Sequence, residues 1–314
     1  MELRHLRYFL VVAEEQHFTR AAERLGMQQP PLSQQIRLLE QELGFELFRR
    51  HPKGADLTAG GKVFLEEAKA ILRSVELASQ KAARAAQGFA GTISIGFTSS
   101  AAAHPLIPGI IRAYRQAYPG VHMALTEANA AELTEDVMHG KVDMGFLRQP
   151  VAQPQGIAFH ALVEEEMLLI LPAGHPLLAD ARKRGRRAGD DAMPEVSLKA
   201  LAGEEFILVR RHGAPGMYSN LIAACENAGF TPKIALEIDR MLTNISLVAA
   251  GVGISVVPAS MKSFHRESVV YCRVKDARPA LLAPINLVCR GEPAGPTQQN
   301  FLKLAREFPG RAGG

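Results

Sequence analysis

The sequence predicts an α/β protein with an all-α N-terminal head, and three observations lead to that fold class. Two helical patterns separated by a turn of about four residues lie between residues 17 and 43. A proline-free stretch with a heptad apolar repeat follows, up to residue 87. From residue 92 onward, apolar strand-like runs alternate with amphipathic helices, as in parallel sheets with crossover connections.

Length and composition describe a chain with room for several cores and no membrane-spanning run. The 314 residues are enough for two or three domains. The net charge of +4 says little about an anionic partner, because residues 1–57 hold eight basic and eight acidic side chains. No apolar run approaches the roughly twenty residues that cross a bilayer, and the chain starts with a helix instead of a signal peptide. We therefore expect a cytoplasmic protein without membrane contact.

The three cysteines give no sign of a metal site. Cys225, Cys272 and Cys289 lack metal-ligand spacing, so they are predicted to be small buried hydrophobic residues. A redox-sensing pair is the alternative, and it is disfavoured because none of them lies in an electropositive loop.

The head is predicted to begin with two helices. Residues 3–15 carry apolar side chains at helical spacing, and we expect this helix to pack behind the two helices that follow it. Residues 18–25 predict a short second helix, capped by the Thr19 hydroxyl and ended by Gly26 in the left-handed conformation.

The third helix is the one predicted to read DNA. In residues 29–43 the apolar side chains lie on one face, at Leu32, Ile36, Leu39 and Leu43. Two prolines are tolerated in its first turn, where amide hydrogens have no helical partner. The N-terminal end of such a helix contacts base edges in a major groove. The predicted DNA-binding residues here are Gln29, Pro30, Pro31, Ser33, Gln34 and Arg37.

A basic hairpin is predicted directly after this helix. Two short apolar runs flank a tip with Pro52 and Gly54, which indicates a wing beside the helix-turn-helix. The basic residues on it include Arg49, and the three assigned to DNA contact are Arg50, His51 and Lys53. A solvated loop is the alternative interpretation of this charge run.

Residues 58–90 are predicted to form a linker helix that dimerises. The heptad seam consists of Phe64, Ala68, Ile71, Val75, Ala78, Ala82, Ala85 and Phe89. Such a repeat is typical of a coiled coil, and its small alanines allow close approach of a partner helix. The alternative is a long helix that lies on its own domain.

The remainder predicts a two-lobed clamshell of the periplasmic-binding-protein type. Residues 91–163 and 268–309 are assigned to lobe I, residues 164–267 to lobe II, and residues 310–314 to a disordered tail. Small ligands bind such open sheets in the crevice at the carboxyl ends of the strands.

The residues predicted to line this cleft and bind an effector are Ser99, Ser100, Asn129, Arg148 and Arg210. The two serines precede a helix, where hydroxyls and free amides favour an anion such as a carboxylate, although serines there are often only helix caps. A basic run at residues 182–187 is predicted to be a solvated insertion, with a second nucleic-acid contact as the alternative.

Several motifs together resemble the LysR-type transcriptional regulators. They are LRYF at residues 6–9, FTRAA at 18–22, QPPLSQQI at 29–36, LEQELG at 39–44 and LFRR at 47–50. The later segments GKVDMGF at 140–146 and LVAAGVGI at 247–254 resemble the co-inducer domain of that family. The resemblance covers nearly the whole chain, and the serine pair is similar to the branch that governs the degradation of aromatic compounds.

This resemblance implies a homotetramer, a dimer of dimers, that binds an interrupted palindrome in double-stranded DNA, bends it and contacts RNA polymerase. It also implies a small organic effector, often an aromatic or organic acid. Two departures matter: Gln28 replaces the usual Ser or Thr before the recognition helix, and Ala130 cannot supply an effector-binding hydroxyl.

Three other functions are alternatives to this prediction. An enzyme is disfavoured because the sequence holds no P-loop, GxSxG, HExxH or dinucleotide motif, and no cofactor is expected. A transporter's solute-binding protein would have no DNA-reading head. A cytoplasmic clamshell that binds a small molecule without controlling transcription is the remaining alternative.

Overall fold

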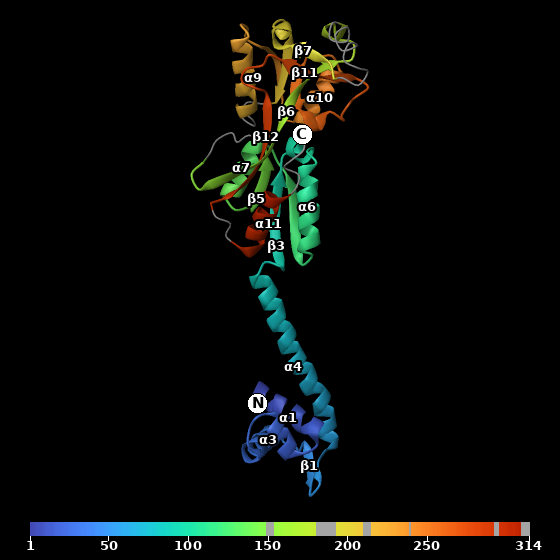
Figure 1. The fold of residues 1–314 in the computed structure, drawn as a ribbon, viewed down its shortest axis with the longest axis vertical. Coiled ribbons are helices and arrows are strands. Elements are labelled where there is room, and N and C mark those ends of the chain that lie inside the picture. The colour runs from blue at the N-terminus through green and yellow to red at the C-terminus, as the bar shows by residue number, and fades with distance from the viewer. Residues whose placement is uncertain (149–153, 180–192, 210–214, 239, 292–294, 309–314) are drawn as a thin grey trace. The chain divides into compact units, whose positions relative to one another are not determined.

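The computed structural model describes residues 1–148, 154–179, 193–209, 215–238, 240–291 and 295–308 (Figure 1). The chain divides into two compact units, Met1–Ala85 and Ala86–Gly314. Among the described residues, no helix is both long and apolar enough to cross a membrane. The predicted tail, Arg210 and the basic run at 182–187 lie outside the described residues.

The first unit is a three-helix head with a two-stranded wing, as predicted. Leu6 and Phe9 of the first helix pack against Leu32, Ile36 and Leu39 of the third, and all five side chains are buried. This apolar contact holds the third helix with its polar face outward. The elements are α1 Leu3–Glu15, α2 Phe18–Arg24, α3 Gln29–Leu43, β1 Phe48–His51, β2 Gly54–Leu57 and α4 Ala59–Ala86.

The start of α2 differs from the prediction. Thr19 lies inside the helix, and the cap is His17, whose Nδ1 accepts the amide hydrogen of Thr19 at 3.3 Å. The predicted end is confirmed, because Gly26 has a φ of +67°. An imidazole can cap a helix as a hydroxyl does, since its unprotonated nitrogen is an acceptor.

The wing is anchored on the turn between α1 and α2. The amide of Ala55 donates to the carbonyl oxygen of Gln16 at 2.9 Å. At Gly54, where φ is +147°, a Cβ atom would lie 2.4 Å from that same oxygen. Only glycine allows this close approach.

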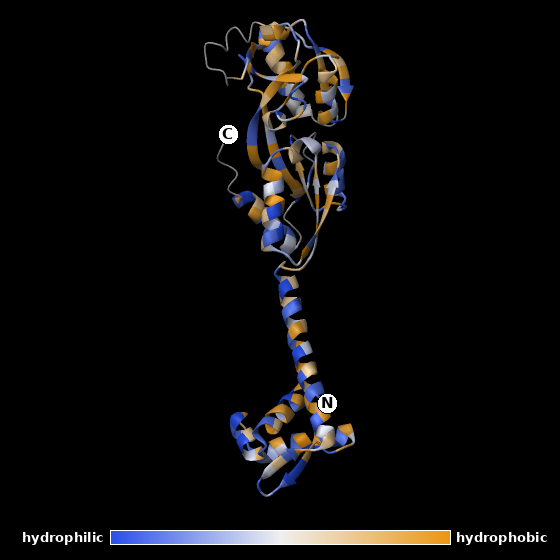
Figure 2. Cartoon of the chain, turned by 90° about the vertical axis from the view of Figure 1, so that its right-hand side faces the viewer, coloured by the Kyte–Doolittle hydropathy of each residue, from blue (hydrophilic) through white to orange (hydrophobic). Residues whose placement is uncertain are grey.

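Helix α4 uses part of its predicted seam within its own head. Ala68 is fully buried in the head core and Phe64 packs beside it, so these two positions follow the alternative interpretation of the linker. Ile71 and Val75 remain 37% and 36% exposed, and apolar positions recur along the helix in Figure 2. Phe89 lies beyond the end of α4 and contacts the Tyr118 ring at 5.2 Å, so it does not belong to a helical seam.

Lobe I of the second unit is a sheet covered by helices on both faces. Strands β3 Gly91–Phe97, β4 Val121–Glu127 and β5 Met144–Leu147 are parallel, as predicted. One face is covered by α6 Leu106–Ala117 and α11 Pro296–Glu307, and the other by α7 Ala130–Met138. A four-residue helix that was not predicted, α5 Ser99–Ala102, follows β3.

Lobe II forms around the second half of a long strand, β6 Ile157–Pro172. Strands β10 Ser255–Pro258 and β11 Val269–Lys275 pair with it antiparallel, and β7 Glu195–Ser197 adds to β11. A separate parallel pair, β8 Glu205–Val209 with β9 Lys233–Ile238, packs with α9 Pro215–Asn227 and α10 Met241–Ala249. The 3-10 helices are η1 Leu198–Leu201 and η2 Ala259–Met261.

The connection between the lobes corrects two expectations. The central sheet is mixed instead of wholly parallel, because β12 Leu282–Arg290 runs antiparallel to both β5 and β6. The return to lobe I was expected near residue 267, yet Val269 and Tyr271 of β11 pack in the lobe II core. The second crossover segment is therefore β12, and lobe II extends past β11.

Candidate functional site

The N-terminal end of α3 presents side chains and few backbone donors. Gln29, Pro30 and Pro31 are exposed, and Gln28, the N-cap residue, makes no side-chain capping bond. The prolines have no amide hydrogen, which removes two of the donors that a helix N-terminus ordinarily offers. A molecule that binds at this end of α3 must therefore be contacted largely by side chains.

Three further predicted residues lie on α3 after its first turn, and one of them, Ser33, contacts the wing. Gln34 and Arg37 are exposed, whereas Ser33 is half-buried. Nη1 of Arg50 donates to the Ser33 hydroxyl oxygen at 2.6 Å. The same guanidinium lies 4.4 Å above the centre of the Phe18 ring, and burial lowers the pKa of Arg50. Arg50, which was predicted to contact a phosphate, is engaged within the head in this structure, and its contact with DNA stays a prediction.

The wing is also joined to α3 at its base. Oε1 of Glu40 accepts the amide hydrogens of Leu47 and Phe48, at 2.8 and 3.1 Å. Glu40 lies seven residues after Ser33, two turns along α3, so two points on one helix face hold β1. The wing and α3 therefore form one surface.

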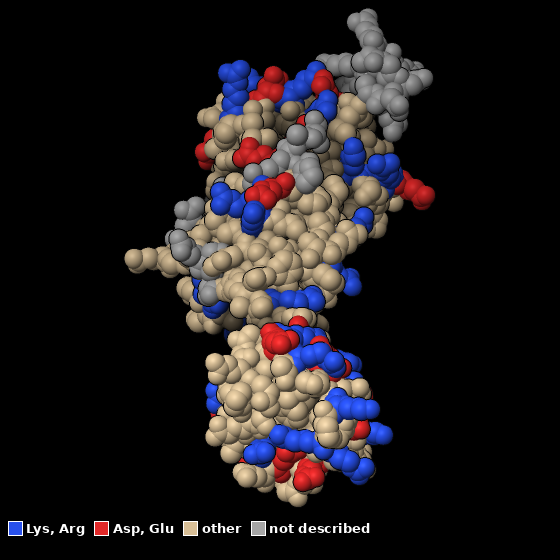
Figure 3. Space-filling view, turned by 60° about the horizontal axis from the view of Figure 1, so that its bottom comes forward, with Lys and Arg blue, Asp and Glu red and all other residues tan. Residues whose placement is uncertain are grey.

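Basic side chains at the wing tip face solvent. Arg49 and Lys53 are exposed, and Figure 3 shows Lys and Arg side chains gathered along one side of the first unit, the part that is blue in Figure 1. His51 is tied across the hairpin, with its Nε2 3.3 Å from a carboxylate oxygen of Asp56. Arg49 and Lys53 are thus available for contact with a phosphate backbone.

The predicted effector residues of lobe I gather at the carboxyl ends of the parallel strands. Thr98 caps α5, since its Oγ1 accepts the amide hydrogen of Ala101 at 3.3 Å, and its hydroxyl lies 3.4 Å from that of Ser100. Ser99 and Ser100 are both half-buried in the first turn of α5. A helix of four residues has a weak dipole, so an anion there would depend on the hydroxyls.

Asn129 acts as a helix cap. Its Oδ1 accepts the amide hydrogens of Ala131 and Glu132, at 3.0 and 2.9 Å, and Glu132 completes a capping box at the start of α7. The acceptor of this side chain is occupied, and its amide nitrogen is the part left for a ligand.

Arg148, predicted as a supporting donor in the cleft, is buried and paired inside the second unit. Its side chain is 3% exposed, and its Nη1 lies 2.5 Å from Oε1 of Glu165. Nη2 donates to the carbonyl oxygen of Ser100 at 2.7 Å and to Oγ of Ser260 at 3.1 Å. Burial lowers the pKa of Arg148, and the Glu165 carboxylate opposes that shift.

Glu165 and Ser260 complete this cluster and were missed in the sequence. Glu165 accepts from the amide and hydroxyl of Ser260, at 2.5 and 2.9 Å. Arg148 comes from lobe I, Ser260 from η2 of lobe II, and Glu165 from the strand that joins them. The alternation of side chains along a strand could have indicated Glu165. In the run of three glutamates at residues 164–166, the middle side chain points to the opposite face from the other two.

A second contact between the lobes lies nearby. Nη1 of Arg240, the N-cap residue of α10, lies 2.8 Å from Oε1 of Glu127 at the end of β4. Both side chains are well exposed, so this pair is worth about 0–1 kcal/mol. It is the weaker of the two interlobe ion pairs described.

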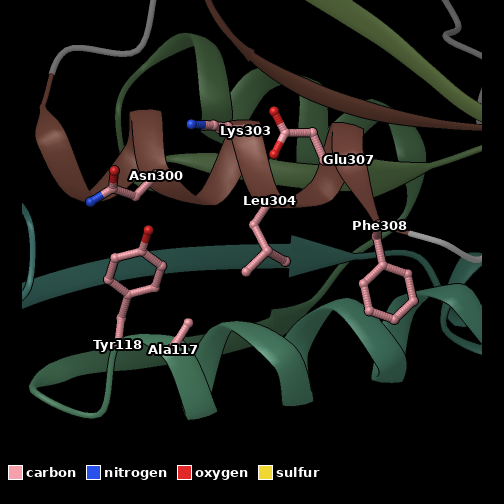
Figure 4. Close-up of a pocket in the computed structure, with 7 residues that line it drawn as sticks. All are labelled: Ala117, Tyr118, Asn300, Lys303, Leu304, Glu307 and Phe308. Carbon is pink, nitrogen blue, oxygen red and sulfur yellow. The ribbon is translucent and has the colours of Figure 1, made fainter.

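An open pocket of about 310 Å³ lies elsewhere in lobe I, between α6 and α11 (Figure 4). It is lined by Ala117, Tyr118, Asn300, Lys303, Leu304, Glu307 and Phe308. Ala117 ends α6 immediately before β4 begins, so the pocket is at the opposite end of the parallel strands from Thr98 and Arg148. It is therefore not the predicted cleft.

Comparison with known proteins gives a consistent result. Residues 86–309 match the family model of the LysR substrate binding domain, and residues 3–62 match that of the bacterial regulatory helix-turn-helix protein, lysR family. The chain is 40% identical over 262 residues to the uncharacterized HTH-type transcriptional regulator YnfL of Escherichia coli, which is 83% of this chain and 84% of that protein. It is 36% identical over 305 residues to the HTH-type transcriptional regulator AlsR of Bacillus subtilis, which is 97% and 95% of the two chains.

Solved structures agree with these sequence matches. The crystal structure of CbnR, a LysR family transcriptional regulator, matches with a TM-score of 0.78 at 28% identity, over 98% of this chain and 100% of that one. Full-length CbnR complexed with its target DNA matches with a TM-score of 0.76 at 28% identity, over 98% and 99%.

Proposed function

The chain belongs to the LysR family of transcriptional regulators, and we propose how its residues read DNA and sense an effector. As a member of that family it is a DNA-binding transcriptional regulator with an effector-binding domain, and not an enzyme. The alternative of a clamshell without a role in transcription is not favoured, because the helix-turn-helix head is present. Since such a regulator acts where the chromosome lies, we place it in the cytoplasm.

We propose that α3 enters the major groove and that the wing follows the neighbouring phosphate backbone. The observation that carries this proposal is the exposed polar end of α3 beside the basic wing tip, with Gln29, Gln34 and Lys53 free of the head core. Glutamine binds adenine through two hydrogen bonds, and lysine neutralises a phosphate.

Gln34→Ala tests base reading. A good bidentate contact is worth about 1–3 kcal/mol of discrimination, so the variant should narrow the affinity gap between operator and scrambled duplex by that amount. Gln41→Ala is the matched control, an exposed glutamine near the other end of the same helix. If Gln34→Ala and Gln41→Ala discriminate as well as the wild type, Gln34 does not read bases.

We propose that the free part of the α4 seam pairs two chains. Ile71 and Val75 expose apolar surface on a helix otherwise rich in charge, and Ala78, Ala82 and Ala85 continue the same row. Each dimer would place one head on each half of an interrupted palindrome, and a dimer of dimers would supply two such pairs of heads. Contact with RNA polymerase and DNA bending belong to the same proposal.

We propose that the effector binds at Ser99 and Ser100, in the first turn of α5 just after β3, between the lobes. The Ala103 side chain, which follows these serines, packs against the lobe II core, so the two lobes meet at this point. Hydroxyl donors suit an organic acid, and the amide nitrogen of Asn129 adds another donor. Arg148 would act through the position of Ser100, whose carbonyl oxygen it holds, and Arg210 stays a prediction.

Ser99→Leu tests the effector site. Titration calorimetry over a panel of aromatic and aliphatic acids should find a ligand for the wild type that Ser99→Leu no longer binds. A reporter gene should lose its response while footprinting shows operator affinity within a few-fold of wild type. A variant that still responds at wild-type effector concentrations would remove Ser99 from the site.

A further inference from the structure

Arg50 of the wing contacts two helices of the head. It lies on β1 of the wing, yet its guanidinium points to α3 and donates to the Ser33 hydroxyl oxygen at 2.6 Å. Its Cζ atom lies 4.4 Å above the centre of the Phe18 ring. The hydrogen bond holds this side chain against α3, the helix proposed to read bases, and the aromatic contact holds it against Phe18 at the start of α2.

This contact fixes what the Ser33 hydroxyl can do. A serine hydroxyl has one hydrogen to donate and two lone pairs to accept with, whereas arginine only donates. Ser33 is therefore the acceptor toward Arg50, and its own hydrogen remains free. A base amino group that approached the second lone pair would meet the positive guanidinium beside it, which disfavours that contact.

We propose that Arg50 is a positioning residue that commits Ser33 to donate a hydrogen bond, and so selects a base edge with an acceptor. In the major groove the acceptors are N7 and O6 of guanine, N7 of adenine and O4 of thymine, and the amino groups of cytosine and adenine are donors. The inference rests on the proposed entry of α3 into the major groove, and it adds the class of base edge that Ser33 reads.

The neighbouring Arg49 provides a matched control. Alternate residues of a strand point to opposite faces, so Arg49 points away from the side on which Arg50 contacts Phe18 and Ser33. Arg49 is exposed and pairs across the hairpin with the position of Asp56. It has the same charge on the same strand without the contact to α3.

The experiment selects duplexes from a randomised library with the full-length chain. Ser33→Ala should relax selectivity at one base-pair position of each half-site, by roughly 2- to 13-fold in relative affinity, as the loss of one hydrogen bond does. Arg50→Met should relax selectivity at that same position, because the methionine side chain still packs on Phe18 but has no hydrogen-bond donor. Ser33→Ala combined with Arg50→Met should cause no further loss of selectivity at that base pair. Arg49→Ala should weaken binding to all DNA sequences by the same factor.

A chemical probe sharpens the result. Where the selected base is a purine, replacing N7 by carbon in a 7-deazapurine duplex should weaken wild-type binding and leave Arg50→Met almost unaffected. Where it is a thymine, 4-thiothymine serves in the same way, because sulfur accepts hydrogen bonds less well than oxygen.

Two results would overturn the inference while base reading by α3 stands. In the first, Arg50→Met weakens every sequence equally and lowers the salt slope by about one, which is the behaviour of a phosphate contact. In the second, Ser33→Ala and Arg50→Met relax different base pairs. A wild-type chain that selects no sequence would overturn the proposed base reading itself, and this inference with it.

Discussion

Glu165→Gln is predicted to destabilise the second unit far more than the same change at the next residue. Glu165 pairs with Arg148 in a nearly closed environment, where the two side chains are 11% and 3% exposed. Glu166 pairs with Arg273 in solvent, where the two are 46% and 56% exposed. The two glutamates lie on one strand and differ in burial, so the comparison isolates the effect of the surroundings.

The expected magnitudes follow from burial. Removing one partner of a buried pair leaves an uncompensated charge and costs about 3–5 kcal/mol, whereas an exposed pair contributes about 0–1 kcal/mol. A glutamine at position 165 would also have only one acceptor oxygen, so its NH2 group would face either the Ser260 amide hydrogen or the Arg148 guanidinium. At about 2–4 °C per kcal/mol for a domain of this size, Glu165→Gln should melt roughly 6–20 °C lower.

The assay is thermal and urea unfolding of the full chain by circular dichroism, with Glu166→Gln as the control. Arg148→Met together with Glu165→Met should recover part of the loss, because no lone charge remains buried. Operator binding in the cold should persist in every variant, since the head has its own core. Equal and small shifts for Glu165→Gln and Glu166→Gln would refute the buried-pair reasoning.

Four further outcomes are expected. Lys53→Ala should lower the slope of log affinity against log salt by about 0.9, as one lost phosphate contact does; an unchanged slope would make the wing tip a solvated loop. Ile71→Glu with Val75→Glu should reduce the oligomer in sedimentation experiments, and an intact wild-type assembly would exclude this seam as the main dimer contact. Gly54→Ala should cost the head more than about 1 kcal/mol in thermal melting, because the new Cβ would meet a backbone oxygen at 2.4 Å. Burial lowers the pKa of His104, so its contribution to stability should be full above the unfolded value of about 6.5 and decline on acidification; His104→Asn should flatten that part of the pH profile of the melting temperature.

Local patterns in the sequence were sufficient to place nearly every helix and strand. The head shows this best, since the apolar spacing of α3, Gly26 and the basic hairpin each appear where they were predicted. These features depend on neighbours within a few residues, so periodicity and turn chemistry report them. The predicted cap of α2, Thr19, was wrong because an imidazole such as that of His17 is a rarer cap than a hydroxyl.

Features that depend on distant partners could not be predicted in this way. Phe64 and Ala68 fit a heptad as well as Ile71 does, and only the folded head shows that they are already buried. Arg148 looks like a cleft donor until Glu165 is placed beside it. Spacing along the chain identifies a face, whereas the group that covers that face comes from elsewhere in the sequence.

The narrow part of the central sheet sets how the lobes can move. Residues 163–166 of β6 pair only with β12 among the described strands, and there Pro284 has no amide hydrogen to donate. The register shifts between Ile285 and Asn286 at the lobe I end of this two-stranded stretch. A two-stranded ribbon takes a larger twist than a wide sheet. The two strands that join the lobes can therefore change their twist more easily than the rest of the sheet. We expect an effector bound between the lobes to change the twist of this ribbon, on the microsecond to millisecond times of domain motion.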